Sequence, residues 1–86
     1  MNPTYLYKHK HFGNLVQITA LGGSWVEFLS NGSLFWLEQL VFDQAYTYYR
    51  DGDPITADLM ALRAQAQATG ILVPKEIQAV YIDIED

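Results

Sequence analysis

The Asn31-Gly32 pair, set between two strongly apolar runs, constrains this chain more than any other feature. Asn-Gly readily takes the two positive φ angles of a type I′ turn, whose twist suits a tight β-hairpin. The flanking runs, residues 24–30 and 33–38, carry large apolar side chains on both alternating faces. Since a half-solvated hairpin shows one polar face, we expect this hairpin to be central, covered on both sides or folded into a small barrel.

Two further strands are predicted before the hairpin, over residues 5–11 and 15–21. On the second of them, Val16, Ile18 and Ala20 are expected to share one face, because side chains alternate along a strand. On the first, the shared face is formed by Tyr5, Tyr7, His9 and His11. Tight glycine-containing turns separate the runs, so the first half of the chain predicts a four-stranded antiparallel β-meander.

The order of these strands resembles that of small SH3-like barrels, in which short strands joined by tight turns form a strongly bent sheet. The resemblance covers about half of the chain and carries no functional residues with it. It implies a barrel-type β-meander. Such barrels bind proteins, peptides and nucleic acids alike, so the likeness fixes no function.

Residues 39–49 fit two structures. Apolar side chains recur there at helical spacing, whereas residues 46–48 also alternate as a strand does. We expect a short helix over residues 39–49, with a strand as the alternative. The Asp-Gly-Asp-Pro sequence of residues 51–54 should end it, because proline cannot continue an existing helix.

A second helix is predicted in the alanine-rich segment that follows. Asp53 or Thr56 can cap its start, Asp58 then lies in its first turn, and Gly70 occupies the position of a left-handed C-terminal stop. Arg63 is expected on the solvated surface. The buried stripe of the helix is expected to consist of Ile55, Leu59, Leu62 and Ala66.

The last predicted element is a strand over residues 77–84, placed at a sheet edge. The chain as a whole, residues 1–86, is then expected to be one α+β domain. In it, the antiparallel and SH3-like meander is followed by one or two helices and this final edge strand.

The charge of the chain is uneven. Its net value is −5, and residues 1–42 balance two lysines against two glutamates, whereas residues 43–86 set three cations against eight carboxylates. An acidic field repels nucleic acid and membrane surfaces, so no direct contact with either is expected. The most apolar window, residues 21–42, contains Glu27, Glu38 and the Asn-Gly turn, which excludes a bilayer span.

No secretory signal opens the chain and no cysteine is present, so we expect a soluble, cytoplasmic protein. No phosphate-binding glycine loop, nucleophile elbow or Cys–His pair appears either, so we expect no enzyme. We also expect no cofactor.

His9 and His11 are the two histidines of the chain. A strand would project both to one side, about 7 Å apart, which is a spacing that metal sites use. The local sequence lacks a third ligand, and an exposed polar strand face explains the pair as well. A small metal-binding protein that uses His9 and His11 is therefore kept as an alternative function.

Aromatic side chains exceed what one small core needs, with two Trp, six Tyr and four Phe. Tyr and Trp dominate interface hot spots, because they bury much area at little entropic cost. We therefore predict a non-enzymatic protein-binding module, an adaptor or inhibitor that docks on a larger protein through an aromatic and acidic surface. The residues of that surface are Tyr46, Tyr48, Tyr49, Asp43, Asp51 and Asp53.

Two other partners stay open. The acidic half can imitate a phosphate backbone and occupy the basic groove of a nucleic-acid-binding protein, as small phage-encoded inhibitors of host defence of the anti-CRISPR type do. Charge mimicry should weaken steeply with salt, whereas aromatic docking should not. The other partner is a second copy of the chain, since residues 81–84 can extend a sheet across a two-fold axis.

Overall fold

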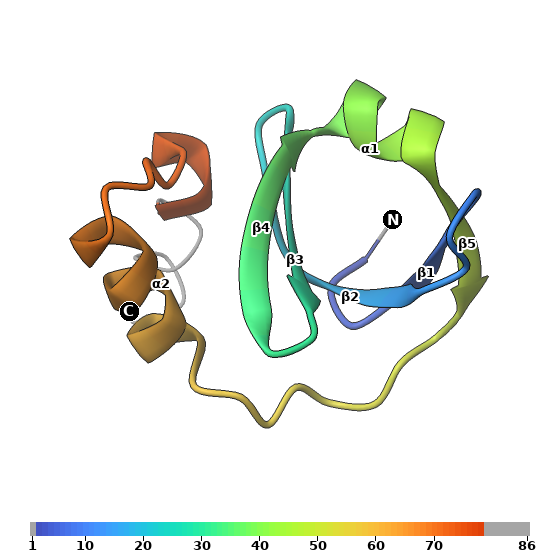
Figure 1. The fold of residues 1–86 in the computed structure, drawn as a ribbon, viewed down its shortest axis with the longest axis horizontal. Coiled ribbons are helices and arrows are strands. Elements are labelled where there is room, and N and C mark those ends of the chain that lie inside the picture. The colour runs from blue at the N-terminus through green and yellow to red at the C-terminus, as the bar shows by residue number, and fades with distance from the viewer. Residues whose placement is uncertain (1, 79–86) are drawn as a thin grey trace.

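The computed structural model describes residues 2–78, and these residues form an α+β fold (Figure 1). In chain order the elements are β1 (Leu6–His9), β2 (Leu15–Gly22), β3 (Trp25–Ser30), β4 (Ser33–Glu38), α1 (Gln39–Ala45), β5 (Tyr46–Arg50) and α2 (Leu59–Ala68). The predicted α+β class and the predicted meander of four antiparallel strands are confirmed.

The strands form one five-stranded sheet in the order β4-β3-β2-β1-β5, in which every neighbouring pair is antiparallel. The sheet bends strongly, and α1 lies across the space between the end of β4 and the start of β5 (Figure 1). Since β4 and β5 remain its two edges, the sheet is open. A closed SH3-like barrel is therefore not confirmed.

The Asn31-Gly32 turn forms as predicted. Both residues have positive φ, 52° and 80°, which is the combination of a type I′ turn, and Ser30 pairs with Ser33 across it. Residues 26–28 of β3 are buried in succession, so both faces of this strand are covered, as expected. β4 is an edge strand, however, so only β3 is central.

The concave face of the bent sheet holds the main core. Its buried residues come from three strands and α1, and they are Tyr7, Val16, Ile18, Val26, Phe28 and Phe42. Phe42 attaches α1 to the sheet, because its ring lies 5.2 Å from the rings of Tyr7 and Phe28. Its full burial stabilises the fold by roughly 1.5–3 kcal/mol.

A β-bulge at Thr19 changes the face that the later residues of β2 occupy. β2 has one residue more than β3 between the pairs that flank Thr19. Ala20 consequently packs on the convex side, whereas Leu21 packs against the main core. The expectation that Ala20 shares a face with Val16 and Ile18 is wrong, because strict alternation does not anticipate an inserted residue.

The segment predicted as a helix over residues 39–49 contains both structures that were considered for it. The helix α1 ends at Ala45, and Tyr46 begins β5, where it pairs with His9 of β1. The helical part is confirmed as far as Ala45. The rest is strand because its backbone completes the free edge of β1, a tertiary contact that local spacing does not reveal.

The second helix starts later than predicted. Asp58 is its N-cap and accepts a hydrogen bond from Ala61 N–H at 3.1 Å, so the expected caps at Asp53 and Thr56 are wrong. The reason lies in the preceding connector, whose Asp53 carbonyl accepts from Gln17 Nε2 at 2.7 Å. This hydrogen bond holds the connector extended along the sheet, and the helix begins only after it.

The end of α2 agrees with the prediction, since Gly70 has a φ of 93°. The predicted stripe is half-buried rather than fully buried, at Ile55, Leu59, Leu62 and Ala66. Arg63 contradicts its prediction, because it is only 6% exposed and faces the sheet. Alanine-rich helices carry few large side chains, so their spacing alone does not identify the face that docks.

A smaller core lies on the convex side of the sheet. Val73 and Ile77 pack there with Ala20, and two partly buried tryptophans, Trp25 and Trp36, join them. Residues 75–78 are helical, so the predicted strand over 77–84 is wrong at its first two positions. Its remaining positions lie outside the described residues. Within the described part, no helix has the length and the hydropathy needed to cross a membrane.

Candidate protein-binding groove

β4 carries backbone hydrogen-bonding groups that point outward from the edge of the sheet, away from β3. The Gln39 N–H donates to the Ser24 carbonyl at 2.7 Å, and in an antiparallel ladder hydrogen-bonded pairs alternate with pairs that are not. By this alternation, the N–H and C=O groups of Leu34 and Trp36 and the N–H of Glu38 point off the free edge, whereas the Glu38 C=O is at the N-cap position of α1. No strand or loop within residues 2–78 pairs with them.

The free edge of β5 is partly used by α1. The Lys10 N–H donates to the Ala45 carbonyl at 2.9 Å, so the same alternation turns the backbone groups of Tyr46 and Tyr48 off this edge. The Tyr46 N–H donates to the Phe42 carbonyl at the end of α1. The backbone of Tyr48 therefore remains directed toward the opening of the sheet.

A groove of about 280 Å³ lies between β4 and the start of β5. Phe35 is 47% exposed at its rim, and its ring stacks on Phe28 with the centroids 5.7 Å apart. On the opposite wall, Tyr46 stacks on Phe42 at 4.6 Å. The full lining is Phe28, Ser30, Phe35, Trp36, Leu37 and Tyr46. An apolar, aromatic lining with few polar groups is typical of a site that receives an apolar side chain.

The charges around the groove are acidic. Residues 11–49, which include β2, β3, β4 and α1, contain no lysine or arginine. Glu38 is exposed at the junction of β4 with α1, and Asp43 is exposed on α1. Lys10 approaches the other end of α1, where its Nζ donates to the Asp43 carbonyl at 3.0 Å. Glu38, which does not line the groove, is thus the exposed charge of β4, at the end of the strand that adjoins α1.

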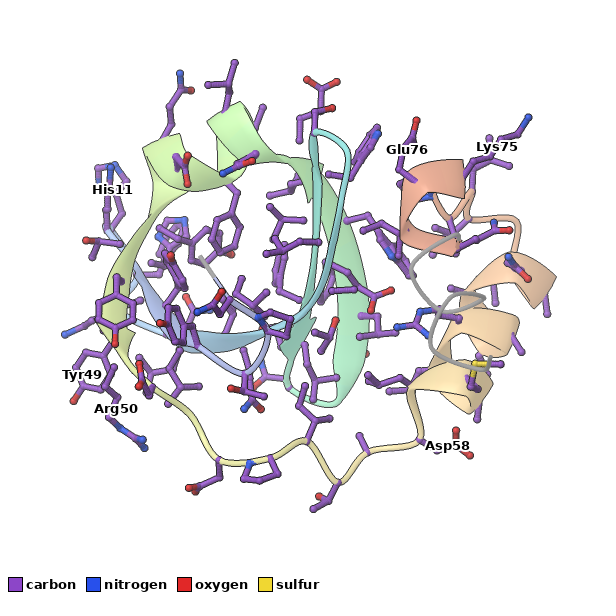
Figure 2. The ribbon with its side chains drawn as sticks, turned by 180° about the vertical axis from the view of Figure 1, so that it is seen from behind. His11, Tyr49, Arg50, Asp58, Lys75 and Glu76 are labelled. Atoms are coloured by element: carbon purple, nitrogen blue, oxygen red, sulfur yellow. The ribbon has the colours of Figure 1, made fainter. Side chains whose placement is uncertain are left out.

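The three tyrosines predicted to form one contact surface lie on two sides of β5. Tyr46 lines the groove, and Tyr48 packs edge-on against Tyr5 and Tyr7 on the same concave side, with centroids at 5.1 and 5.8 Å. Tyr49 is 52% exposed and projects outward from β5 (Figure 2). The structure therefore brings Tyr46 and Tyr48 together and separates Tyr49 from them.

The predicted acidic residues are also dispersed. Asp43 is on α1, Asp51 directly follows β5, and Asp53 lies in the connector to α2. Asp51 accepts a hydrogen bond from the Tyr48 hydroxyl at 2.5 Å, and this bond is the main reason why the pKa of Tyr48 is raised to about 12. Burial raises the pKa of Tyr46 as well. Both phenols are therefore neutral donors at ordinary pH.

His9 has a structural role that the sequence did not indicate. Its Nδ1 accepts hydrogen bonds from the backbone N–H groups of His11 and Phe12, both at 3.1 Å, and so closes the turn after β1. The His9 and His11 rings lie 6.0 Å apart. No group of three or more metal-ligating side chains occurs in the described part of the chain. The metal-binding alternative therefore gains no support from these residues.

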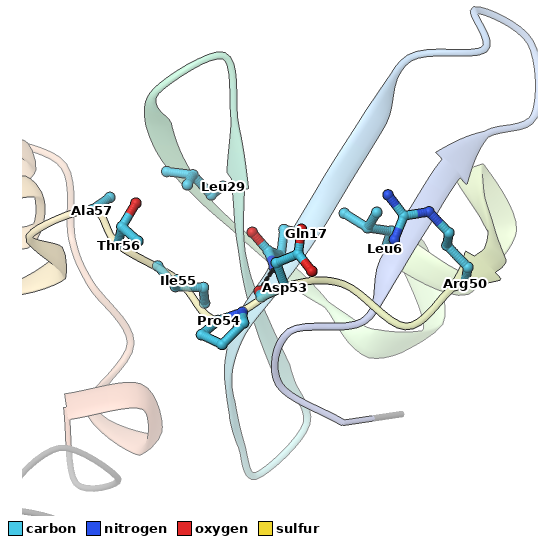
Figure 3. Close-up of a pocket in the computed structure, with 9 residues that line it drawn as sticks. All are labelled: Leu6, Gln17, Leu29, Arg50, Asp53, Pro54, Ile55, Thr56 and Ala57. Carbon is cyan, nitrogen blue, oxygen red and sulfur yellow. Dashed lines mark hydrogen bonds between the residues drawn. The ribbon is translucent and has the colours of Figure 1, made fainter.

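A second cavity, of about 220 Å³, lies under the connector between β5 and α2 (Figure 3). The connector crosses the convex face of the sheet, and Gln17 fastens it by donating to the carbonyls of Asp53 and Thr4, at 2.7 and 3.2 Å. Leu6 and Leu29 form part of its floor. The cavity is explained by the path of the connector, and it has no aromatic lining.

A buried polar cluster on the convex side was not predicted from the sequence. Glu27 is fully buried, and its two oxygens accept from Thr19 at 2.6 Å, from Trp36 Nε1 at 2.8 Å and from Arg63. One signal for it existed. A carboxylate in the middle of a strand that is covered on both faces must find a cationic or donor partner, because an unpaired buried charge is very costly.

Comparison with protein-family models, with curated proteins and with solved structures finds no match to this chain.

Proposed function

We propose that this domain is a non-enzymatic protein-binding module, an adaptor or inhibitor that docks on a larger protein through the groove between β4 and β5. The observation that carries the proposal is the groove itself, an aromatic-lined hollow beside a β4 edge whose backbone groups are unpaired within residues 2–78. In this proposal the open sheet is an SH3-like barrel lacking closure, and the protein acts in the cytoplasm.

Aromatic side chains at the rim supply the main support. An exposed ring that already stacks on a buried one offers a large contact area without losing much side-chain freedom on binding, as interface hot spots do. Phe35, stacked on Phe28, has this arrangement. Of the residues predicted from the sequence, the proposal retains Tyr46 as the opposite wall and Asp43 as part of the acidic surround.

Nucleic-acid mimicry receives less support, because part of the acidic surface has local structural roles. Asp51 accepts from Tyr48, and Asp58 caps α2. A phosphate mimic needs carboxylates that face a basic partner in a row, whereas these two point to their own backbone and side-chain neighbours. Aromatic docking is therefore the proposal, and mimicry is an outcome that the experiment below distinguishes.

The experiment compares two variants that remove similar exposed rings. Phe35→Ser removes the rim of the groove, and Tyr49→Ser removes a ring of similar exposure, 52% against 47%, on the outer side of β5. Each is immobilised beside the wild type, and partners are captured from the lysate of cells that make the protein. The captures are run at low salt and at about 0.5 M salt, where charge interactions reach only about 4 Å.

A partner that Phe35→Ser loses, and that Tyr49→Ser retains at both salt concentrations, is the expected result. Loss with Tyr49→Ser alone would move the binding surface to the outer side of β5. A partner that binds at low salt only, whichever ring is removed, would favour the acidic mimic. Capture of the chain by itself alone would favour a homo-oligomer.

A further inference from the structure

We infer that the occupant of this groove is an extended segment of the partner that adds a strand to the free edge of β4 and carries a lysine or arginine beside Glu38. The inference rests on the proposed function and specifies the chemistry of its partner. Three independent features of the described residues support it: the backbone edge, the width of the opening and the charge at one end.

The backbone of β4 is ready to pair. Leu34 and Trp36 direct their N–H and C=O groups off the edge, and peptide groups of this kind are the template that strand addition uses. Edges of this type are usually protected by lysine, proline or a bulge. The residues of β4 are Ser-Leu-Phe-Trp-Leu-Glu, without any of these devices, and the β3–β4 ladder is regular from Trp25 to Ser30.

The length of α1 indicates how wide the opening is at the end that this helix spans (Figure 1). α1 has seven residues and connects the last residue of β4 directly to the first residue of β5. At 1.5 Å per residue it is about 10 Å long. Neighbouring strands lie about 4.8 Å apart, so one strand placed between two edges needs twice this spacing. That distance is nearly the length of α1.

The side chains of an added strand would meet the groove alternately. Phe35 and Leu37 face the concave side, and Trp36 between them faces the convex side. Because side chains alternate along a strand, every second residue of the partner points into the hollow formed by Phe28, Phe35 and Tyr46. An aromatic or large aliphatic side chain suits that position.

The negative charge of Glu38, at the α1 end of β4, favours a positively charged residue on the partner. Glu38 is exposed, no ion pair within residues 2–78 engages it, and no lysine or arginine occurs in residues 11–49. A basic side chain on the partner at this end therefore meets an acid without a competing cation from β2, β3, β4 or α1. An acidic side chain at the same place would be repelled.

A random library of twelve-residue peptides tests the inference against the full chain. The expected enriched peptides alternate large apolar residues with others and carry lysine or arginine at one end. The selected peptide is then resynthesised with a methyl group on one backbone nitrogen at a time. In a ladder only every second N–H pairs with β4, so methylation should weaken binding about tenfold or more at alternate positions. Between them, only a position whose N–H reaches the free backbone of β5 near Tyr48 should also be sensitive.

Two variants of Glu38 separate its charge from its backbone. Glu38→Gln removes the charge alone and should weaken binding of the selected peptide about threefold, as loss of an exposed ion pair does. Glu38→Pro also removes an N–H that points off the edge, and Glu38 has a φ of −64°, which proline adopts without strain. It should weaken binding further than Glu38→Gln.

The outcomes distinguish the inference from the proposed function. Peptides that lose binding with Phe35→Ser, but show no alternate methylation pattern or no basic residue, would overturn the inference and leave the groove as a binding site. Peptides that bind equally to Phe35→Ser would overturn both, as would a library that yields none above the level of an immobilised, urea-unfolded control.

Discussion

Arg63 on α2 holds both carboxylate oxygens of Glu27 on β3, a residue 36 positions earlier in the chain. Arg63 Nη2 lies 2.6 Å from Glu27 Oε1, and Arg63 Nε lies 2.8 Å from Glu27 Oε2. Their side chains are 7% and 0% exposed. Burial lowers the pKa of Arg63, and the hydrogen bonds and charge of Glu27 act in the opposite direction. This contact joins α2 to the convex face of the sheet.

Removal of the Arg63 guanidinium should strongly destabilise the fold. Arg63→Met retains a long apolar side chain, but it takes the guanidinium away from a carboxylate that is completely buried. Breaking a buried pair in this way typically lowers the free energy of unfolding by about 3–5 kcal/mol. Urea unfolding followed by tryptophan fluorescence measures the loss, because Trp25 and Trp36 are partly buried against the convex core.

The double variant Glu27→Gln/Arg63→Met is the control. It removes the buried charge together with its partner and leaves an amide that can accept from Trp36, so most of the loss should be recovered. If the double variant is as unstable as Arg63→Met, packing of the Arg63 side chain, rather than its charge, holds α2 in place.

Two glycines should respond to alanine for different reasons. A Cβ on Gly22 would lie 2.3 Å from the Glu76 carbonyl oxygen, whereas a Cβ on Gly32 would meet nothing within 4 Å. Gly32→Ala should therefore cost only the left-handed backbone strain, about 1–2 kcal/mol. In Gly22→Ala the new Cβ clashes with backbone atoms of Glu76, which cannot rotate away as a flexible side chain can. The substitution should therefore displace the helical residues near Glu76 and expose Ile77.

Amide hydrogen exchange separates the two glycine variants. Faster exchange confined to residues 71–78 is expected for Gly22→Ala, and uniformly faster exchange through global unfolding is expected for Gly32→Ala. The same uniform pattern in both variants would mean that the convex core does not depend on the close approach at Gly22.

Ionisation of Tyr48 gives a prediction at alkaline pH. Its hydrogen bond to Asp51 is the largest cause that raises its pKa from 10.0 to about 12. Because the folded value is the higher one, the stabilisation is complete below pH 10 and declines as the pH rises toward 12. Asp51→Asn should lower the pKa of Tyr48 toward 10.0. The pKa of Tyr48 is measured by titrating tyrosinate absorbance and subtracting the titration of Tyr48→Phe. An unchanged midpoint in Asp51→Asn would contradict the assignment of the raised pKa to Asp51.

The acceptor role of His9 can be separated from the packing of its ring. His9→Asn places an oxygen near the position of Nδ1, so the N–H groups of His11 and Phe12 keep an acceptor. His9→Phe keeps a ring against Tyr46 but offers no acceptor, and it should lower the free energy of unfolding by about 1–2 kcal/mol.

Exchange of the His11 and Phe12 amides should be fast in His9→Phe and slow in His9→Asn. Equal protection in both variants would mean that the turn does not depend on Nδ1. A zinc titration of the wild type that produces no heat at micromolar protein would also remove the metal-binding alternative.

Local features of the sequence were enough to predict the strands and turns of the first half. The Asn31-Gly32 turn is encoded by two residues whose φ preferences act without help from the rest of the chain. The Gly70 stop of α2 is of the same kind. Features that depend on distant contacts were not predictable: the bulge at Thr19, the pairing of β5 with β1, and the pair formed by Glu27 and Arg63.

In the candidate groove, too, some residues could be predicted from local sequence and others could not. Tyr46 was singled out from the sequence because it belongs to an aromatic cluster. The structure places Tyr49 on the other side of β5, at the register shift between the Leu6–Arg50 pair and the Tyr7–Tyr48 pair. Phe28 and Phe35 were counted among the surplus aromatic residues, but they were not assigned to the contact surface. Their role follows from β4 being an edge strand, and strand order in a sheet is set by the whole fold.

Phe35 and Trp36 are consecutive residues of β4 that serve different sides of the sheet. Phe35 borders the groove, while the indole of Trp36 donates to Glu27 at 2.8 Å, in the cluster that holds α2. A single layer of backbone therefore separates an exposed hollow from a half-buried indole. The chain consequently contains its own optical reporter: a molecule that shifts β4 from one side should change the emission of Trp36 on the other, without any added label.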